Sequence, residues 1–288
     1  MKKLELGDIK IKRGLEKTDN CYIFEMDNGE ILKVYDDNLL FILDLIDLDI
    51  EKRILDSKEI NNVKEIIVPN GAVYNNNSFV GYTMPKAKGV DYNEKERSLS
   101  LEDRENLKQY VFWHLKLEDI IRRANKENVV FPDLLTCDNI FFHDNNFSFI
   151  DYDGIQINDN KVLSISSSLG NPAQYYNKKY MKEMEIFTDE LDKKSLIVLF
   201  FLTAFNINLA NVGEINPYTG EVITLDQIFQ ILGLEDYDIM NKVWKLFSLK
   251  DKNEFLDKDL YRLIDNYDLR VIGKVSGSDC YVKKLFKK

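Results

Sequence analysis

One segment of this chain constrains its fold more than any other, because it sets three oxygen-bearing side chains around two short apolar runs. Between residues 131 and 154, a turn that carries Asp133 precedes an apolar run starting after Asn139, and a second apolar run ends at Asp151. The Asn-rich stretch between the two runs predicts a β-hairpin. We expect this hairpin to bring the three side chains together at one of its ends.

These side chains are the kind of ligand that magnesium prefers. Mg²⁺ is a hard cation held by one or two carboxylates and substrate phosphates, whereas zinc requires His or Cys. The two histidines, His114 and His143, are interpreted as structural because they lie in a helical pattern and in the hairpin. Asp151 and Asp153 both follow the second run, and we favour Asp151 as the metal ligand because it ends the strand directly. A hairpin that is merely polar is the alternative.

The order of these residues resembles the catalytic core of the protein kinase-like superfamily, in which a loop aspartate, an asparagine and a metal-binding aspartate after a hydrophobic hairpin recur. The resemblance implies that ATP, bound with Mg²⁺, is the phosphoryl donor. It also implies that Asp133 is catalytic and accepts the hydroxyl proton. Asn139 and Asp151 would then bind the metal, with Asp153 as the second candidate.

The N-terminal part of the chain adds two features in the order that kinases have them. Residues 22–35 predict a hairpin whose turn lies at 27–29 and whose second strand carries Lys33. This looks like the kinase lysine that contacts the ATP phosphates, although an edge-strand lysine is the simpler reading. A mostly buried helix is expected over residues 38–57. Its Glu51 lies eighteen positions after Lys33, about the separation at which a kinase helix glutamate pairs with that lysine, and a solvated glutamate is the alternative.

A strand that ends at Met84 and continues into a polar segment resembles the hinge between the two kinase lobes. Backbone groups from Met84 to Ala87 would then bind the ATP adenine. We therefore expect an α+β, bilobal, protein kinase-like fold. Residues 1–86 would form a small β-rich lobe with one long helix, and residues 87–288 a larger, mainly helical lobe that includes a C-terminal extension.

Features further along the chain agree with this resemblance. A helical pattern over residues 100–128 leads into the proposed catalytic loop, and residues 191–205 contain an apolar run of about ten residues, too short to span a bilayer. Kinases place a structural aspartate at the start of such a helix, and Asp192 matches it, although Asp192 could equally be a simple cap. The serine-rich residues 164–168 and the segment 170–172 lie where kinases have their activation segment.

The chain departs from the kinase pattern in its loops. Gly14 is one glycine where the glycine-rich loop has three, which puts phosphate clamping by backbone amides in doubt. Phe131 and Pro132 replace the His-Arg pair before the catalytic aspartate. The loop from Asp133 is one residue longer than usual, and Leu135 stands where protein kinases have a catalytic lysine.

Composition excludes other classes of protein. A net charge of −10 and a pI near 4.9 argue against a nucleic-acid binder, which needs a basic surface. The lack of an apolar N-terminal segment predicts a cytoplasmic protein without a membrane span. Three cysteines without a CxxC pair predict free thiols rather than disulfides or a zinc site.

The favoured function is an ATP-dependent phosphotransferase that acts on protein Ser or Thr hydroxyls, because the helix of Asp192 and the segment 170–172 are similar to those of protein kinases. The replacement at Leu135 is instead similar to small-molecule kinases of the aminoglycoside or choline kinase type. A pseudokinase scaffold with a regulatory protein partner is a further alternative, since the glycine-rich and catalytic loops are altered. Transfer of a nucleotidyl group by the same fold also stays open.

Overall fold

The computed structural model describes most of the first 200 residues of the chain: 1–18, 20–45, 48–58, 60, 62–92, 104–134, 139–158, 162, 181–183, 186–193, 195, 196, 199 and 224. The structural findings concern these residues. Leu135, Cys137, Cys280, the serine-rich segment, the segment 170–172 and, apart from Thr224, the C-terminal extension from residue 207 lie outside them.

The largest element is a six-stranded mixed sheet with the order β1-β5-β6-β4-β3-β2. Strands β1 and β5 are parallel, and the other neighbours are antiparallel. The six strands are β1 (Lys2–Glu5), β2 (Ile11–Lys17), β3 (Cys21–Met26), β4 (Ile31–Tyr35), β5 (Gly71–Asn75) and β6 (Ser78–Met84). The short helix η1 (Leu6–Asp8) joins the first two strands.

The predicted hairpin around residues 27–29 is confirmed as β3 and β4. Gly29 has a positive φ of 84° in its turn, a conformation that glycine adopts without steric cost. The second strand, β4, lies between β3 and β6, so Lys33 is on a central strand and the edge-strand reading was wrong. Leu32, on the other face of β4, packs with Met26 and Val73 in the core of the sheet.

The single long helix predicted over residues 38–57 is wrong, because two shorter helices occupy this region. They are α1 (Asp37–Leu45) and α2 (Ile50–Leu55). The carboxylate of Asp49 accepts a hydrogen bond of 2.8 Å from the amide of Lys52 and so caps the N-terminus of α2. An aspartate competes with helical hydrogen bonding in a helix interior, which is why this sequence restarts the helix rather than continuing it.

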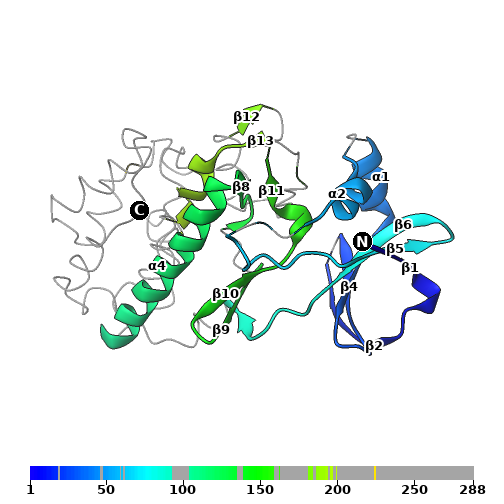
Figure 1. The fold of residues 1–288 in the computed structure, drawn as a ribbon, viewed down its shortest axis with the longest axis horizontal. Helices are drawn as coiled ribbons and strands as arrows, with labels where there is room; N and C mark the ends of the chain where they lie inside the picture. Colours follow the sequence, from blue (N-terminus) through cyan, green and yellow to red (C-terminus); the bar gives the residue numbers. More distant parts are fainter. Residues whose placement is uncertain are drawn as a thin grey trace, which may run out of the picture.

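A second group of elements surrounds the predicted catalytic segment (Figure 1). The long helix expected before this segment is present as α4 (Arg104–Lys126), and it carries the fully buried His114. A three-stranded sheet has the order β10-β9-β7, and two pairs of short strands complete the group. These strands are β7 (Val90–Asp91), β8 (Val129–Val130), β9 (Ile140–His143), β10 (Asn146–Phe149), β11 (Gln156–Ile157), β12 (Met181–Glu183) and β13 (Ile186–Phe187).

The described elements therefore form an α+β structure, a six-stranded mixed sheet with smaller sheets beside it. In Figure 1 the six-stranded sheet with α1 and α2 lies at one end, and α4 and the small sheets lie toward the other. Among the described helices, none is both long and apolar enough to cross a membrane.

Two contacts join the segment between α2 and β5 to the hairpin β9–β10. The amide of Phe149 donates to the carbonyl of Glu65, and the amide of Ile67 donates to the carbonyl of Phe149, both at 2.8 Å. Gly89, with φ of 86°, brings the segment after β6 against β9, where an added Cβ would lie 2.0 Å from the carbonyl oxygen of Phe142. Only glycine fits there.

Candidate active site

The hairpin predicted between Asn139 and Asp151 is present as β9 and β10. Ile140 pairs with Phe149, so the open end of the hairpin lies where the chain enters and leaves it. One residue beyond, the amide of Ile150 donates to the carbonyl of Asn139 at 2.9 Å. Backbone pairing therefore holds Asn139 and Asp151 at the same end of the hairpin.

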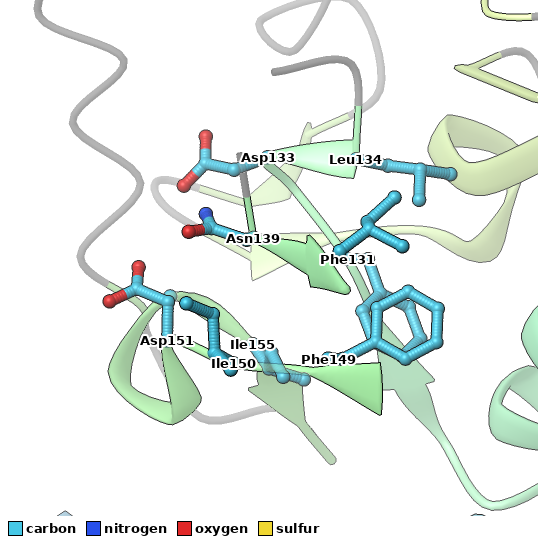
Figure 2. A pocket seen from close by; sticks show the side chains of 10 residues that line it. Phe131, Asp133, Leu134, Asn139, Phe149, Ile150, Asp151 and Ile155 are labelled. Carbon is cyan, nitrogen blue, oxygen red and sulfur yellow. The ribbon is translucent and has the colours of Figure 1, made fainter. Parts of the chain in front are cut away.

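Asp133, Asn139 and Asp151 line one small pocket of about 20 Å³ at this end. Figure 2 shows their polar groups on one side of the pocket, with Leu134 and the rings of Phe131 and Phe149 on the other. A volume of this size holds about one water molecule or ion. The remaining lining residues are mostly apolar: Phe131, Leu134, Ile140, Phe149, Ile150, Gly154 and Ile155.

Gly154 leaves space between the two carboxylates of the pocket. A Cβ added there would lie 2.8 Å from Oδ2 of Asp151 and 3.4 Å from Oδ2 of Asp133. Because both distances start from one point, the two oxygens are at most 6.2 Å apart. The space left by the absent side chain of Gly154, which we call the cradle, is bordered by both carboxylates.

The turn at Asp151 gives its two acidic side chains different exposure. Asp151 has φ of 63° and ψ of 53°, a left-handed conformation that aspartate and asparagine tolerate better than most residues. The amide of Gly154 donates to the carbonyl of Asp151 at 2.8 Å and closes the turn, η3 (Tyr152–Gly154). As a result Asp151 borders the pocket, with 27% of its side chain exposed, whereas Asp153 is buried.

Lys33 reaches both aspartates from the sheet. Its Nζ forms an ion pair with Oδ1 of Asp151 and donates to the two carboxylate oxygens of Asp153 at 3.0 and 2.9 Å. The hydroxyls of Tyr35 and Tyr82 also donate to Asp153, each at 2.8 Å. Lys33 is 7% exposed, so these contacts compensate a charge that is nearly removed from water.

The electrostatics of this cluster follow from its burial and its contacts. Burial and the neighbouring Asp153 raise the pKa of Asp151 to about 6, against the lowering effect of Lys33. Burial alone would raise the pKa of Asp153 as well, but Lys33 and the two tyrosine hydroxyls hold that pKa low, at about 2. Burial would lower the pKa of Lys33, and the two aspartates raise it well above its ordinary value. The lysine and Asp153 are therefore both charged.

The predicted pair between Lys33 and Glu51 is not formed in the described part of the chain. Glu51 instead accepts a hydrogen bond of 2.8 Å from the hydroxyl of Tyr74. Arg53, two positions along α2, is the helix residue that faces the site, and its Nη2 donates to the carbonyls of Tyr152 and Ile155. Residues two apart on a helix point to opposite sides, which explains why Glu51 and Arg53 have different neighbours.

Asp192 positions the chain just before Asp133. Its fully buried carboxylate accepts hydrogen bonds from the amide of Phe131 at 2.9 Å and from Nδ2 of Asn125 at 2.6 Å. Burial raises the pKa of Asp192 to about 7, despite these two donors. Both contacts reach other segments, so Asp192 does more than cap a helix.

The segment expected to bind adenine lies at the end of β6. Met84 pairs with Ile31 of β4 and is buried, and Ala87 is half-buried. Lys86, between them, donates to Glu25 of β3 at 3.2 Å. The segment therefore borders the end of the large sheet, and its role in binding ATP stays a prediction.

The turn between β2 and β3 differs from a glycine-rich phosphate loop. Gly14 lies within β2 rather than at the turn. The hydroxyl of Thr18 accepts from the amide of Asn20 at 3.2 Å and from the amide of Cys21 at 3.0 Å. These two amides at the tip are thus bonded inside the turn instead of pointing toward a ligand.

The donors in the pocket suit one magnesium ion better than a closed metal site. Within the residues that the structure describes, no group of three or more His, Cys, Asp or Glu side chains has the arrangement of a metal centre. Asp151 and Asn139 both line the pocket and carry side-chain oxygens, and Mg²⁺ usually takes its other ligands from phosphates and water. The residues therefore fit a magnesium ion that takes its remaining ligands from other molecules.

Comparison with known proteins adds no assignment to this geometry. No protein-family model matches the chain, and a search of the curated proteins finds no match either.

The two tyrosines and Gly154 are site residues that sequence reasoning missed. Tyr35 follows Lys33 by two positions on β4 and therefore shares its face of the sheet, and Tyr82 is the cross-strand partner of Lys33. Because side chains alternate between the two faces of a strand, the sequence of β4 could have placed Tyr35 beside Lys33. Tyr82 could be identified only once the pairing of β4 with β6 was known. The role of Gly154 depends on the position of Asp133 in the folded chain, and the sequence around Gly154 gives no information on that position.

Proposed function

We propose that the protein is an ATP-dependent phosphotransferase with a bilobal, protein kinase-like fold, in which MgATP binds beside the open end of β9–β10 and a protein Ser or Thr hydroxyl is the acceptor. One observation carries the proposal: Lys33, Asp133, Asn139 and Asp151 come from separate parts of the chain and meet at this end of the hairpin. The residues are those that the kinase resemblance assigns to phosphate, proton and metal.

Each residue then has a distinct role. Asp133 accepts the proton of the attacking hydroxyl, since a carboxylate that lines the pocket beside the metal ligands can act as a general base. Asn139 and Asp151 would hold Mg²⁺, which when bound neutralises charge on the phosphate oxygens. Lys33 orients the phosphates through its ammonium group, and Asp192 fixes the backbone before Asp133 through the amide of Phe131.

A pseudokinase scaffold is the second candidate, and the turn at Thr18 favours it. The amides of Asn20 and Cys21 already bond to the hydroxyl of Thr18, so this turn offers less to a triphosphate than a glycine-rich loop does. Such a protein would act through a partner surface rather than through phosphoryl transfer.

The deciding experiment compares the wild type with Asp133→Asn and Asp151→Asn. Calorimetry measures ATP binding with and without Mg²⁺, and intact-protein mass spectrometry, peptide arrays and a panel of small alcohols detect the transferred group. Asp144→Asn is the matched control, because Asp144 lies at the exposed tip of the same hairpin and has a positive φ that asparagine accepts.

We expect Asp133→Asn to bind MgATP and to lose transfer, and Asp151→Asn to lose the Mg²⁺-dependent part of binding. Peptide phosphorylation supports a protein kinase, and phosphorylation confined to small alcohols overturns the protein acceptor. A wild type that binds MgATP without transfer favours the pseudokinase, and gain of a nucleotidyl group reassigns the reaction. Loss of function in Asp144→Asn would show that the effects are not specific to the pocket.

A further inference from the structure

Asp153 is enclosed by donors from the large sheet. Its residue exposure is 1%, and each carboxylate oxygen accepts two hydrogen bonds. Oδ1 accepts from Lys33 at 3.0 Å and from Tyr82 at 2.8 Å. Oδ2 accepts from Lys33 at 2.9 Å and from Tyr35 at 2.8 Å. Protein groups thus donate two hydrogen bonds to each oxygen of this carboxylate.

The same geometry separates Asp153 from the metal pocket. The pocket is lined by Asp133, Asn139 and Asp151, and Asp153 is not part of its lining. A carboxylate that binds Mg²⁺ must turn an oxygen lone pair toward the ion, and both oxygens of Asp153 instead face Lys33 and the tyrosines. The two acids of this turn therefore have different tasks.

We infer that Asp153, rather than Glu51, is the carboxylate that positions Lys33 for the phosphates, with Tyr35 and Tyr82 fixing the orientation of Asp153. This inference rests on the proposed function. Of the two acids in the turn, it assigns only Asp151 to the metal, and it moves the partner of the lysine from a helix to the turn that carries this metal ligand.

A regulatory consequence follows from this placement. In an enzyme whose lysine is held by a helix glutamate, movement of the helix breaks the pair and switches the site off. Here Lys33 is held by the turn itself, and Arg53 of α2 contacts that turn through the backbone carbonyls of Tyr152 and Ile155 and the ring of Tyr152. Removing the carboxylate of Glu51 should therefore leave the lysine in place.

Two double-mutant cycles test the assignment without any need for activity. Urea unfolding is measured for Lys33→Met, Asp153→Asn and the double variant, and for the matched cycle with Glu51→Gln. We expect the first cycle to show a coupling of about tenfold or more in the unfolding equilibrium constant, and the second to be additive within about twofold. Coupling of Lys33 to Glu51 instead of Asp153 would overturn the inference.

The test can still be carried out if the single variant Asp153→Asn does not fold. If Asp153→Asn fails to fold, the neutral pair in the double variant should restore folding, because the fully buried position 153 then bears no charge and Asp151, which also loses Lys33, is 27% exposed to water. A double variant that also stays unfolded would overturn the inference, since Asp153 would then be needed for more than holding Lys33.

The magnesium requirement separates a positioning residue from a metal ligand. In steady-state phosphorylation assays, Asp153→Asn should lower kcat and leave the Mg²⁺ concentration for half-maximal rate within about twofold, whereas Asp151→Asn should raise that concentration about tenfold or more. A raised Mg²⁺ requirement in Asp153→Asn would overturn the inference while the proposed function stands. A wild type that binds no MgATP would overturn the proposed function, and the catalytic role of Asp153 with it.

Discussion

Replacing Gly154 with alanine should damage the proposed metal site while leaving the fold intact. The new Cβ would lie 2.8 Å from Oδ2 of Asp151, about 0.6 Å closer than the 3.4 Å at which ordinary contact begins. The carboxylate of Asp151 cannot simply rotate away from the new Cβ, because its other oxygen is bonded to Lys33. The contact therefore displaces the whole carboxylate. A displacement of about 0.5 Å exceeds what a preorganised site tolerates, and about 1 Å costs on the order of 100-fold in rate.

We therefore expect Gly154→Ala to lower kcat/KM for MgATP by about 10- to 100-fold, or about 1.4–2.7 kcal/mol of transition-state stabilisation. Gly154 is not among the positive-φ glycines, so alanine fits the backbone and the free energy of unfolding should change by less than about 1 kcal/mol. The assay pairs steady-state kinetics with urea unfolding. Gly7→Ala is the control, since a Cβ there meets nothing within 4 Å.

Full activity in Gly154→Ala would refute this reasoning, because it would show that the cradle is not part of the site. An equal loss of activity in Gly7→Ala would refute it as well.

Further predictions concern stability. Asp192→Ala should lower the free energy of unfolding by about 1–3 kcal/mol in urea titrations, because the buried amide of Phe131 loses its acceptor; an unchanged midpoint would contradict this. Lys33→Met should cost about 3–5 kcal/mol by the same measurement, since Asp153 would keep a buried charge without its cation. The pKa of Asp192 is raised from 3.8 to about 7 in the folded protein, so the folded state binds the extra proton and stability should fall as pH rises through this window, by at most about 1.4 kcal/mol per pH unit. Asp192→Asn should lack that slope in unfolding measured across this range. Thr18→Ala should cost about 0.5–1.5 kcal/mol without weakening MgATP binding measured by calorimetry, since the turn amides then lose an internal acceptor.

The hairpin β9–β10 could be predicted from sequence because its information is local. Two apolar runs, a polar turn and the period of a strand determine which residues stand at its open end. The convergence of Asn139 and Asp151 follows directly from that pairing. The position of Lys33 on a strand was predictable for the same reason.

The partner of Lys33 was not predictable, because it depends on the phase of a helix. Spacing along the chain suggested Glu51, but the cap at Asp49 fixes where α2 begins and hence which side chain faces the turn. Arg53 takes that place. The alternative partner, Asp153, is separated from Lys33 by 120 residues, and its burial against Tyr82 depends on the assembled sheet.

The backbone bonds on either side of Phe149 have a mechanical consequence. They fasten β10 to residues 65–67, two positions before the turn at Asp151. If this segment and the hairpin turn against each other, the two bonds form the pivot, and Asp151, two residues from Phe149, is displaced least. Amide hydrogen exchange would detect such a pivot as slow exchange at Ile67 and Phe149.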